Sequence, residues 1–200
     1  MSEVVVRLGH HRVAIELPDH LLGDGILTSL RSDAPAGGID ERIVIGVAED
    51  QSYSVQGPNG LRETGLKRGA LLEHLLGRAA DRLTERAGVP VLRAAAVGWG
   101  DGAVLIAGPE ASGKSSLAAW FVEKGFALIG DGRIGLADAT GSLTGYPAPF
   151  TFAADAADHL VELAEFGTAP MARTATRIHV GVKDSWRAAA DAHPCRMMIF

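Results

Sequence analysis

Apolar and polar residues alternate in the first part of the chain, which indicates strands rather than helices. The alternation runs over residues 3–17 and is interrupted around Gly9, His10 and His11, so it predicts a β-hairpin. Two further strands are expected at 42–48 and 52–56. Of the other segments before residue 61, we expect 19–40 to be irregular and 49–51 and 57–60 to be turns.

A change to helical spacing marks the end of this β-rich part. Six apolar residues between positions 69 and 87 fall on one face of a long amphipathic helix: Leu71, Leu72, Leu75, Leu76, Ala79 and Leu83. Gly88 stands where a helix-ending glycine belongs, and Pro90 follows it. Residues 1–88 are therefore predicted to form a small β-rich lobe closed by one long helix.

Two apolar runs open the second half of the chain. They lie at 91–97 and 103–107, and the turn residues Asp101 and Gly102 between them predict a β-hairpin. The second run has no polar alternation, which is typical of a strand buried on both faces.

An amphipathic stretch and more apolar runs follow the hairpin. We expect a helix over 113–124, with Leu117, Trp120 and Phe121 on one stripe, and then a buried strand over 126–129. Further strands are expected at 134–137, 143–146, 177–182 and 195–200, an extended segment at 146–150, and helices at 155–165 and 184–191. The predicted fold class is α/β or mixed α+β, with 89–200 either a second domain or continuous with 1–88.

Composition narrows the class of protein. The 200 residues (20.9 kDa) are 47% hydrophobic and 22% charged, which argues against wholesale disorder and against a coiled coil. A net charge of −5 argues against a nucleic-acid partner, and a single cysteine, Cys195, excludes a disulfide scaffold. The start of the chain lacks a signal-peptide pattern and no apolar run reaches membrane-spanning length, so we expect a cytoplasmic protein without a membrane partner.

One motif carries candidate chemistry. Residues 108–115 fit G-x-x-x-x-G-K-[ST], a pattern that a chain of this composition would contain by accident roughly 0.006 times. The match follows the predicted buried strand and opens the predicted helix, so backbone N–H groups and the helix dipole would face one point. The expected nucleotide-binding residues are Gly108, Pro109, Glu110, Ala111, Ser112, Gly113, Lys114, Ser115 and Ser116. The alternative interpretation is a glycine-rich turn with a surface lysine.

Three side chains would serve a bound ATP or other nucleoside triphosphate. Lys114 would contact the β- and γ-phosphates, and the Ser115 hydroxyl would bind Mg²⁺. Asp131 ends the strand predicted at 126–129, beside the loop, and is the candidate second Mg²⁺ ligand and the candidate general base. Its alternative role is that of an ordinary turn aspartate.

The segments 92–97, 108–131 and 146–155 together resemble the catalytic domain of HPr kinase/phosphorylase and its relatives. Roughly residues 91–160 carry this resemblance. It implies the nucleotide-binding core also seen in phosphoenolpyruvate carboxykinase, and phosphoryl transfer from ATP·Mg²⁺ to serine on a small protein or peptide. It also implies a homo-oligomer, because HPr kinases assemble into hexamers.

Two positions depart from the family pattern and leave two functions open. Arg93 stands where the family has a histidine, and Gly132 stands where it has a second aspartate. Arg93 is either a catalytic cation that stabilises charge on the transferred phosphoryl group or a surface arginine. The chain is therefore either a serine kinase-like phosphotransferase, which we favour, or a non-catalytic nucleotide-binding regulator.

Overall fold

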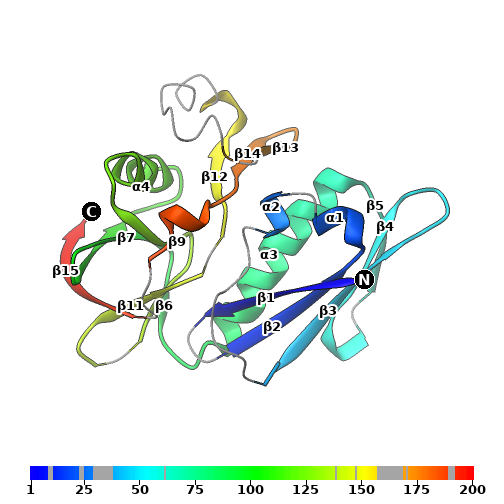
Figure 1. Ribbon diagram of the computed structural model, residues 1–200, viewed down its shortest axis with the longest axis horizontal. Helices are drawn as coiled ribbons and strands as arrows, with labels where there is room; N and C mark the ends of the chain where they lie inside the picture. The colour runs from blue at the N-terminus through cyan, green and yellow to red at the C-terminus, as the bar shows by residue number, and fades with distance from the viewer. Residues whose placement is uncertain are drawn as a thin grey trace.

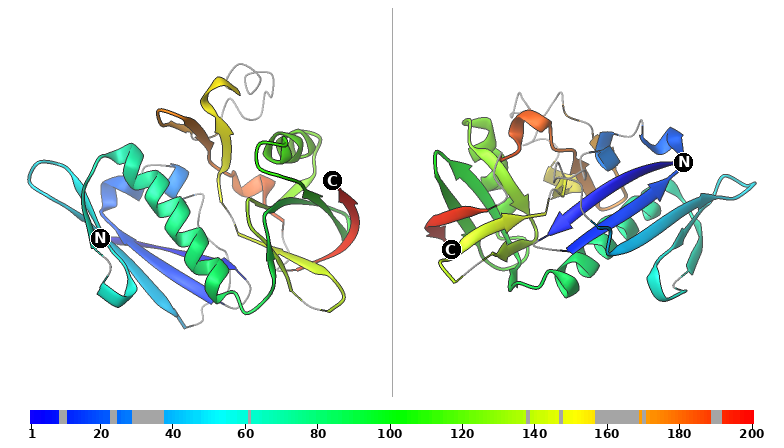
Figure 2. Two further views of the ribbon diagram at one scale, coloured as in Figure 1. Left: turned by 180° about the vertical axis from the view of Figure 1, so that it is seen from behind. Right: turned by 60° about the horizontal axis from the view of Figure 1, so that its bottom comes forward.

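The computed structural model describes residues 1–8, 11–22, 25–28, 38–60, 62–137, 139–146, 148–156, 169, 171–188 and 192–200. These residues form a mixed α+β structure with sheets of five, seven and three strands (Figure 1). The five-stranded sheet and the longest helix lie on one side of the molecule, and the other two sheets lie on the other side (Figure 2). The mixed α+β class expected from the sequence is confirmed.

The first sheet begins with the predicted hairpin. Strands β1 (Ser2–Leu8) and β2 (His11–Leu17) pair antiparallel over their whole lengths. The order continues through β3 (Glu41–Val47), which is parallel to β2, to β4 (Tyr53–Gln56) and β5 (Arg62–Leu66). Residues 58–60 form a 3-10 turn at the expected place. The sequence interpretation missed β5, because Arg-Glu-Thr-Gly-Leu has no alternation of apolar and polar residues.

The segment 19–40 was expected to be irregular, and for its first residues this is wrong. Short helices α1 (Asp19–Leu22) and α2 (Gly25–Thr28) follow β2. Leu21, Ile26 and Leu27 are buried against the sheet and the long helix, which is the packing that holds these single turns in place. Residues 23–24 and 29–37 lie outside the described part.

The long helix is confirmed as α3 (Arg68–Arg86). Leu71, Leu75 and Leu83 are almost fully buried against β1 and β2. Gly88 has φ +67°, the left-handed conformation of a helix-ending glycine. Tyr146, from the second half of the chain, is 1% exposed in this same core, so the two halves share buried surface.

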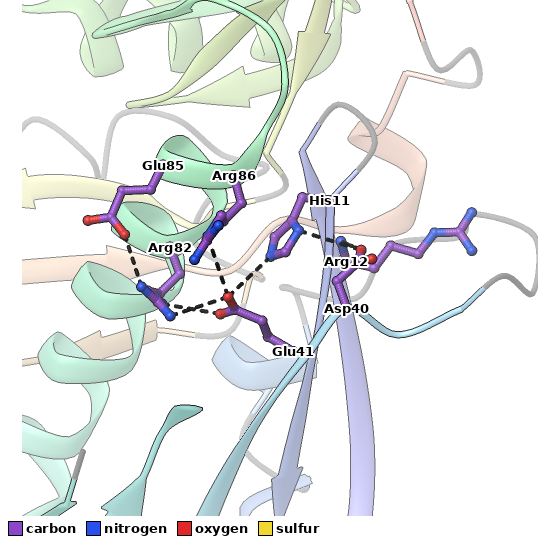
Figure 3. A network of polar contacts seen from close by, with 7 residues as sticks. All are labelled: His11, Arg12, Asp40, Glu41, Arg82, Glu85 and Arg86. Atoms are coloured by element: carbon purple, nitrogen blue, oxygen red, sulfur yellow. Dashed lines mark hydrogen bonds and ion pairs between the residues drawn. The ribbon is translucent and has the colours of Figure 1, made fainter. Parts of the chain in front are cut away.

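A polar network ties the end of α3 to the start of β3 (Figure 3). Arg82 donates two hydrogen bonds to the carboxylate of Glu41, at 3.1 and 3.2 Å, and a third at 3.0 Å to Glu85. His11 lies between Asp40, at 3.5 Å, and Glu41, at 4.0 Å. The Glu41 side chain is 11% exposed and that of Arg82 is 24% exposed, so this ion pair is partly shielded from solvent.

The second sheet contains the predicted hairpin of β7 (Ala94–Trp99) and β8 (Gly102–Ala107). Its strand order is β6-β10-β11-β15-β8-β7-β9. The other strands are β6 (Val91–Leu92), β9 (Ala127–Asp131), β10 (Ile134–Leu136), β11 (Ser142–Gly145) and β15 (His193–Ile199). Every strand that the sequence predicted in 126–146 and at 195–200 is present.

Helix α4 (Lys114–Glu123) covers this sheet next to β7, β8 and β9. The expected apolar stripe is wrong in part: Ala118, Ala119 and Val122 are buried, whereas Trp120 is 47% exposed. Small side chains let the helix approach the alanine-rich β7 closely, so the bulky aromatic ring is left at the rim.

The third sheet lies beside α4 and contacts β9 through its first strand. It consists of β12 (Phe150–Ala153), β14 (Arg177–Val180) and β13 (Met171–Arg173), all antiparallel. The helix expected at 155–165 lies largely outside the described residues, which show only a 3-10 turn at Ala154–Ala156. The helix expected at 184–191 is wrong as far as it is described, since Asp184–Trp186 is one 3-10 turn and Arg187 is extended. No helix in the described part of the chain has the length and apolar character needed to cross a membrane.

Candidate functional site

The ends of three neighbouring strands, β8, β7 and β9, lie side by side at one edge of the second sheet. In the pairing register, Ala94 lies opposite Ala107, and Ala95 lies opposite both Ile106 and Asp131. The carboxyl ends of β8 and β9 therefore flank the amino end of β7. Through this register the residues singled out from the sequence, which are far apart along the chain, are brought to one edge.

The 108–113 loop leaves β8 at this edge and turns into α4. Gly108 has φ +145° and Gly113 has φ +87°, so both adopt conformations that favour glycine. A Cβ atom on Gly108 would lie 2.8 Å from Ser112 Oγ, so a larger residue there would require that hydroxyl to shift. Ala111, at φ +60°, is a non-glycine residue held in the left-handed region. Strain of this kind gathers at ligand-binding loops.

Helix α4 begins directly behind the loop. Gly113 is its N-cap residue and makes no side-chain capping bond, while its carbonyl accepts the first helical hydrogen bond from Leu117 at 2.8 Å. The N–H groups of the first turn have no carbonyl partner inside a helix, and the helix dipole makes this end positive. The helix start and the curled loop therefore present donors suited to an anion.

Lys114, Ser115 and Asp131 meet below the loop. The Ser115 hydroxyl donates a hydrogen bond of 3.0 Å to Asp131 Oδ1. The Lys114 ammonium donates to the carbonyl oxygen of Pro109 at 2.5 Å and is close enough to Asp131 to lower the pKa of that carboxyl group. The motif and the aspartate, 16 positions apart in sequence, thus form one cluster.

Asp131 is 6% exposed, and this burial governs its protonation. Burial raises its pKa from 3.8 to about 6. Hydrogen bonds from the Ser115 hydroxyl and from the Thr151 backbone N–H lower the pKa but do not cancel the effect of burial, and neither does the charge of Lys114. A carboxyl group with this pKa exchanges its proton close to neutral pH, as a general base must.

The two glycines on either side of Asp131 stand there for different structural reasons. Gly130 leaves little room for a ligand, because an added Cβ would lie 3.0 Å from the carbonyl oxygen of Tyr146 and 3.1 Å from Gly145 Cα. Gly130 suits the close crossing of β9 and β11, where a larger residue would require its neighbours to shift. Gly132 has φ +88°, and an added Cβ there would meet no described atom within 4 Å. The space beside Asp131 is on the Gly132 side.

Arg93 reaches the rim of the site rather than its centre. Its guanidinium lies 3.8 Å from the Glu110 carboxylate, with the two side chains 71% and 80% exposed. Because the register puts Arg93 next to the pair Ala94–Ala107, it stands beside the start of the 108–113 loop. The structure does not bring Arg93 into contact with Lys114, Ser115 or Asp131.

Two residues of the site were missed by the sequence interpretation. Thr151, on β12, donates its backbone N–H to Asp131, and its hydroxyl lies 3.1 Å from Nδ1 of His179 on β14. His179 is 2% exposed, and burial lowers its pKa. No local pattern in the sequence predicts these contacts, because they depend on where the third sheet packs.

No group of three or more His, Cys, Asp or Glu residues suited to a metal ion occurs in the part of the chain that the structure describes. A divalent cation at this edge would therefore rely on the oxygen atoms of Ser115 and Asp131, on water and on its ligand. Mg²⁺ tolerates such sparse protein ligation, since it keeps several waters and is bound by one or two protein groups together with phosphates. The oxygen donors present fit Mg²⁺, whereas a zinc site would require nitrogen or sulfur ligands.

Comparison of the chain with protein-family models, with curated proteins and with solved structures finds no match.

Proposed function

We propose that the chain binds a nucleoside triphosphate with Mg²⁺ at residues 108–116 and transfers the γ-phosphoryl group to a hydroxyl of a small protein or peptide. The observation that carries the proposal is the 3.0 Å hydrogen bond from Ser115 to a buried Asp131, directly below a glycine-bent loop and the start of α4. The resemblance to HPr kinase/phosphorylase implies the same donor and the same class of acceptor. ATP is the donor that we favour.

Each group of the cluster has a distinct task in binding. The 108–113 loop and the first turn of α4 cradle the phosphates with backbone N–H groups, and the Lys114 ammonium leaves the Pro109 carbonyl to contact them. Ser115 and Asp131 hold Mg²⁺, which supplies positive charge against the phosphate oxygens. The Ser115 hydroxyl contacts Asp131 already, so both oxygens face one point before any ligand arrives.

Transfer requires a bond to form, a bond to break and a proton to move. The acceptor hydroxyl oxygen forms a bond to the γ-phosphorus as the bond to the β,γ-bridging oxygen breaks, and the nucleoside diphosphate departs. The hydroxyl proton passes to the Asp131 carboxylate. In the protein without a bound cation, Asp131 has a pKa of about 6 and is mainly ionised at pH 7.5. Arg93, released from Glu110, would stabilise negative charge on the transferred group.

A specific observation favours a second function, that of a non-catalytic nucleotide-binding regulator. Asp131 contacts Ser115 and is followed by Gly132 in place of a second aspartate, and the nearby Arg93 is paired with an exposed Glu110. One carboxylate serves poorly as metal ligand and general base at once. In this second function the loop binds the nucleotide, and no bond is made or broken.

A transfer assay separates the two functions. The protein is incubated with γ-³²P-ATP, Mg²⁺ and a library of serine-, threonine- and tyrosine-containing peptides, and the labelled peptide is measured beside the release of phosphate. The kinase predicts labelled peptide with wild type and none with Asp131→Asn, while the nucleotide still binds. Asp101→Asn, which removes an exposed hairpin-turn carboxylate, is the matched control and should keep full transfer. Nucleotide binding with no labelled peptide would favour the regulator.

A further inference from the structure

Strand β12 forms one edge of the third sheet and lies between α4 and β14 (Figure 1). In the register that joins β12 to β14, the Ala154 N–H donates a hydrogen bond of 3.0 Å to the Thr176 carbonyl. Backbone groups of successive residues in an antiparallel strand point alternately to its two sides. The even-numbered residues of β12 therefore bond to β14, and the odd-numbered ones, Thr151 and Ala153, point away from it.

The backbone contact of Thr151 agrees with this alternation, because its N–H reaches Asp131 rather than β14. Three further backbone groups point the same way: the carbonyl of Thr151 and both the N–H and the carbonyl of Ala153. Among the residues that the structure describes, none of these three groups takes part in a hydrogen bond. A row of such donors and acceptors on a strand edge is a template for one more strand.

The packing of β12 leaves this edge accessible at its far end. Phe150 and Phe152 are buried in the same apolar core as α4, so the helix covers one face of the strand. Ala153, in contrast, is an exposed residue. Solvent, or a second chain, can therefore reach the backbone of Ala153 without any movement of α4.

The same edge leads directly to the phosphate-binding cluster. Asp131, which accepts the Thr151 N–H, also accepts the hydrogen bond of 3.0 Å from the Ser115 hydroxyl. A chain paired with Ala153 would run toward this carboxylate and end its pairing there, because Asp131 already occupies the Thr151 N–H. Neighbouring strands lie about 4.8 Å apart, so the residue of that chain opposite Thr151 would lie beside Asp131.

We propose that the acceptor is an extended peptide segment that adds to the third sheet along β12, with its hydroxyl residue beside Asp131. This inference rests on the proposed function, because it names how the acceptor reaches that same site. Hydrogen bonds to the backbone of Ala153 and to the Thr151 carbonyl supply affinity that does not depend on acceptor side chains. An acceptor hydroxyl must then lie in an extended segment, such as a chain terminus or a linear peptide, and a hydroxyl inside a helix does not fit.

The test compares two pooled libraries of heptapeptides with serine at the centre, in the transfer assay with γ-³²P-ATP and Mg²⁺. The second library carries an N-methyl group on the backbone amide of every residue except serine, which keeps the side chains and removes the donors that strand pairing needs. We expect at least tenfold less labelled peptide from the methylated library. Equal labelling of the two libraries would overturn the inference and leave the proposed function standing. No label in either library, while ATP still binds, would overturn the proposed function and this inference with it.

A proline variant locates the docking edge. Ala153→Pro removes an N–H that points away from β14, a place where a strand tolerates proline, and should lower labelling of the unmethylated library at least fivefold. Met171→Pro is the matched control and should leave labelling unchanged, because its N–H points outward from β13 at the opposite edge of the same sheet.

The folding of both variants is checked by circular dichroism, and the comparison of the two libraries decides the question if Ala153→Pro does not fold. Unchanged labelling with a folded Ala153→Pro would refute the proposed edge. Unchanged labelling together with a smaller assembly in size-exclusion chromatography would assign the edge to a second copy of the chain, and would refute the inference as well.

Discussion

Asp131→Asn should make the protein more stable at neutral pH, by an amount that depends on pH in a defined way. Burial raises the pKa of Asp131 from 3.8 to about 6, so the folded protein binds a proton more tightly here than the unfolded chain does. Between these two values the stability of the wild type therefore falls as pH rises. Near pH 3 the carboxyl group is protonated in both states and the penalty is absent.

The magnitude follows from the size of the shift. About two pKa units at 1.36 kcal/mol each correspond to roughly 3 kcal/mol, lost progressively between about pH 4 and pH 6. The asparagine keeps the shape of the side chain but carries no charge. The free energy of unfolding of Asp131→Asn minus that of the wild type should therefore rise by about 3 kcal/mol from pH 3.5 to pH 7.5.

Urea unfolding of both proteins at half-unit pH intervals measures this difference. Taking the difference cancels the titration of every group that the two proteins share. Asp101→Asn, measured in parallel, corrects for the change of one unit in net charge at an exposed turn. A difference that stays flat over this pH range, or that falls as pH rises, would show that Asp131 is not a desolvated carboxylate and would refute the reasoning.

Three further predictions concern binding and stability. Mg²⁺-dependent ATP binding, followed by calorimetry, should weaken as pH falls through about 6, because protons compete with the cation for Asp131. Asp131→Asn should lack this pH dependence, and an identical dependence in the variant would contradict this prediction. Gly113→Ala should lower the free energy of unfolding by about 1–2 kcal/mol in urea, because φ is +87° at that position. Gly77→Ala, inside α3, should raise it by about 0.5–1 kcal/mol. Changes of the same sign in the two variants would contradict the backbone conformations described here. Glu41→Gln should lower the free energy of unfolding by about 1–3 kcal/mol, because it breaks the shielded pair with Arg82. Glu85→Gln, on the exposed side of the same arginine, should lower it by less than about 1 kcal/mol. Equal losses in the two variants would argue against the network in Figure 3.

The elements that the sequence predicted well are those with a strong local period. The hairpin of β1 and β2 follows an alternation of two, and α3 follows a leucine repeat closed by Gly88, so neither depends on distant contacts to be recognised. Asp131 was placed beside the loop by a similarly local argument. A buried apolar run must be a strand, and an aspartate at its end must lie at the edge of the sheet.

The errors and omissions share a different cause. The buried face of α4 is set by the close approach of Ala118 and Ala119 to the alanine-rich strand β7. The sequence interpretation gave more weight to large apolar residues and therefore placed Trp120 on the buried face. Thr151 reaches Asp131, and His179 reaches Thr151, only because the third sheet packs beside β9, a contact between segments far apart in the chain. Gly130 is explained by the crossing strand β11, which no neighbouring residue reveals.

Equilibrium titration of the protein with a fluorescent ATP analogue, with and without Mg²⁺, tests most directly whether residues 108–116 bind a triphosphate. The account predicts saturable binding that Mg²⁺ strengthens. Lys114→Ala should weaken it about 10- to 100-fold through the loss of one charge-assisted contact, while Lys124→Ala, at the other end of α4, should leave it unchanged. Absence of binding, or equal affinity in wild type and Lys114→Ala, would contradict the central claim.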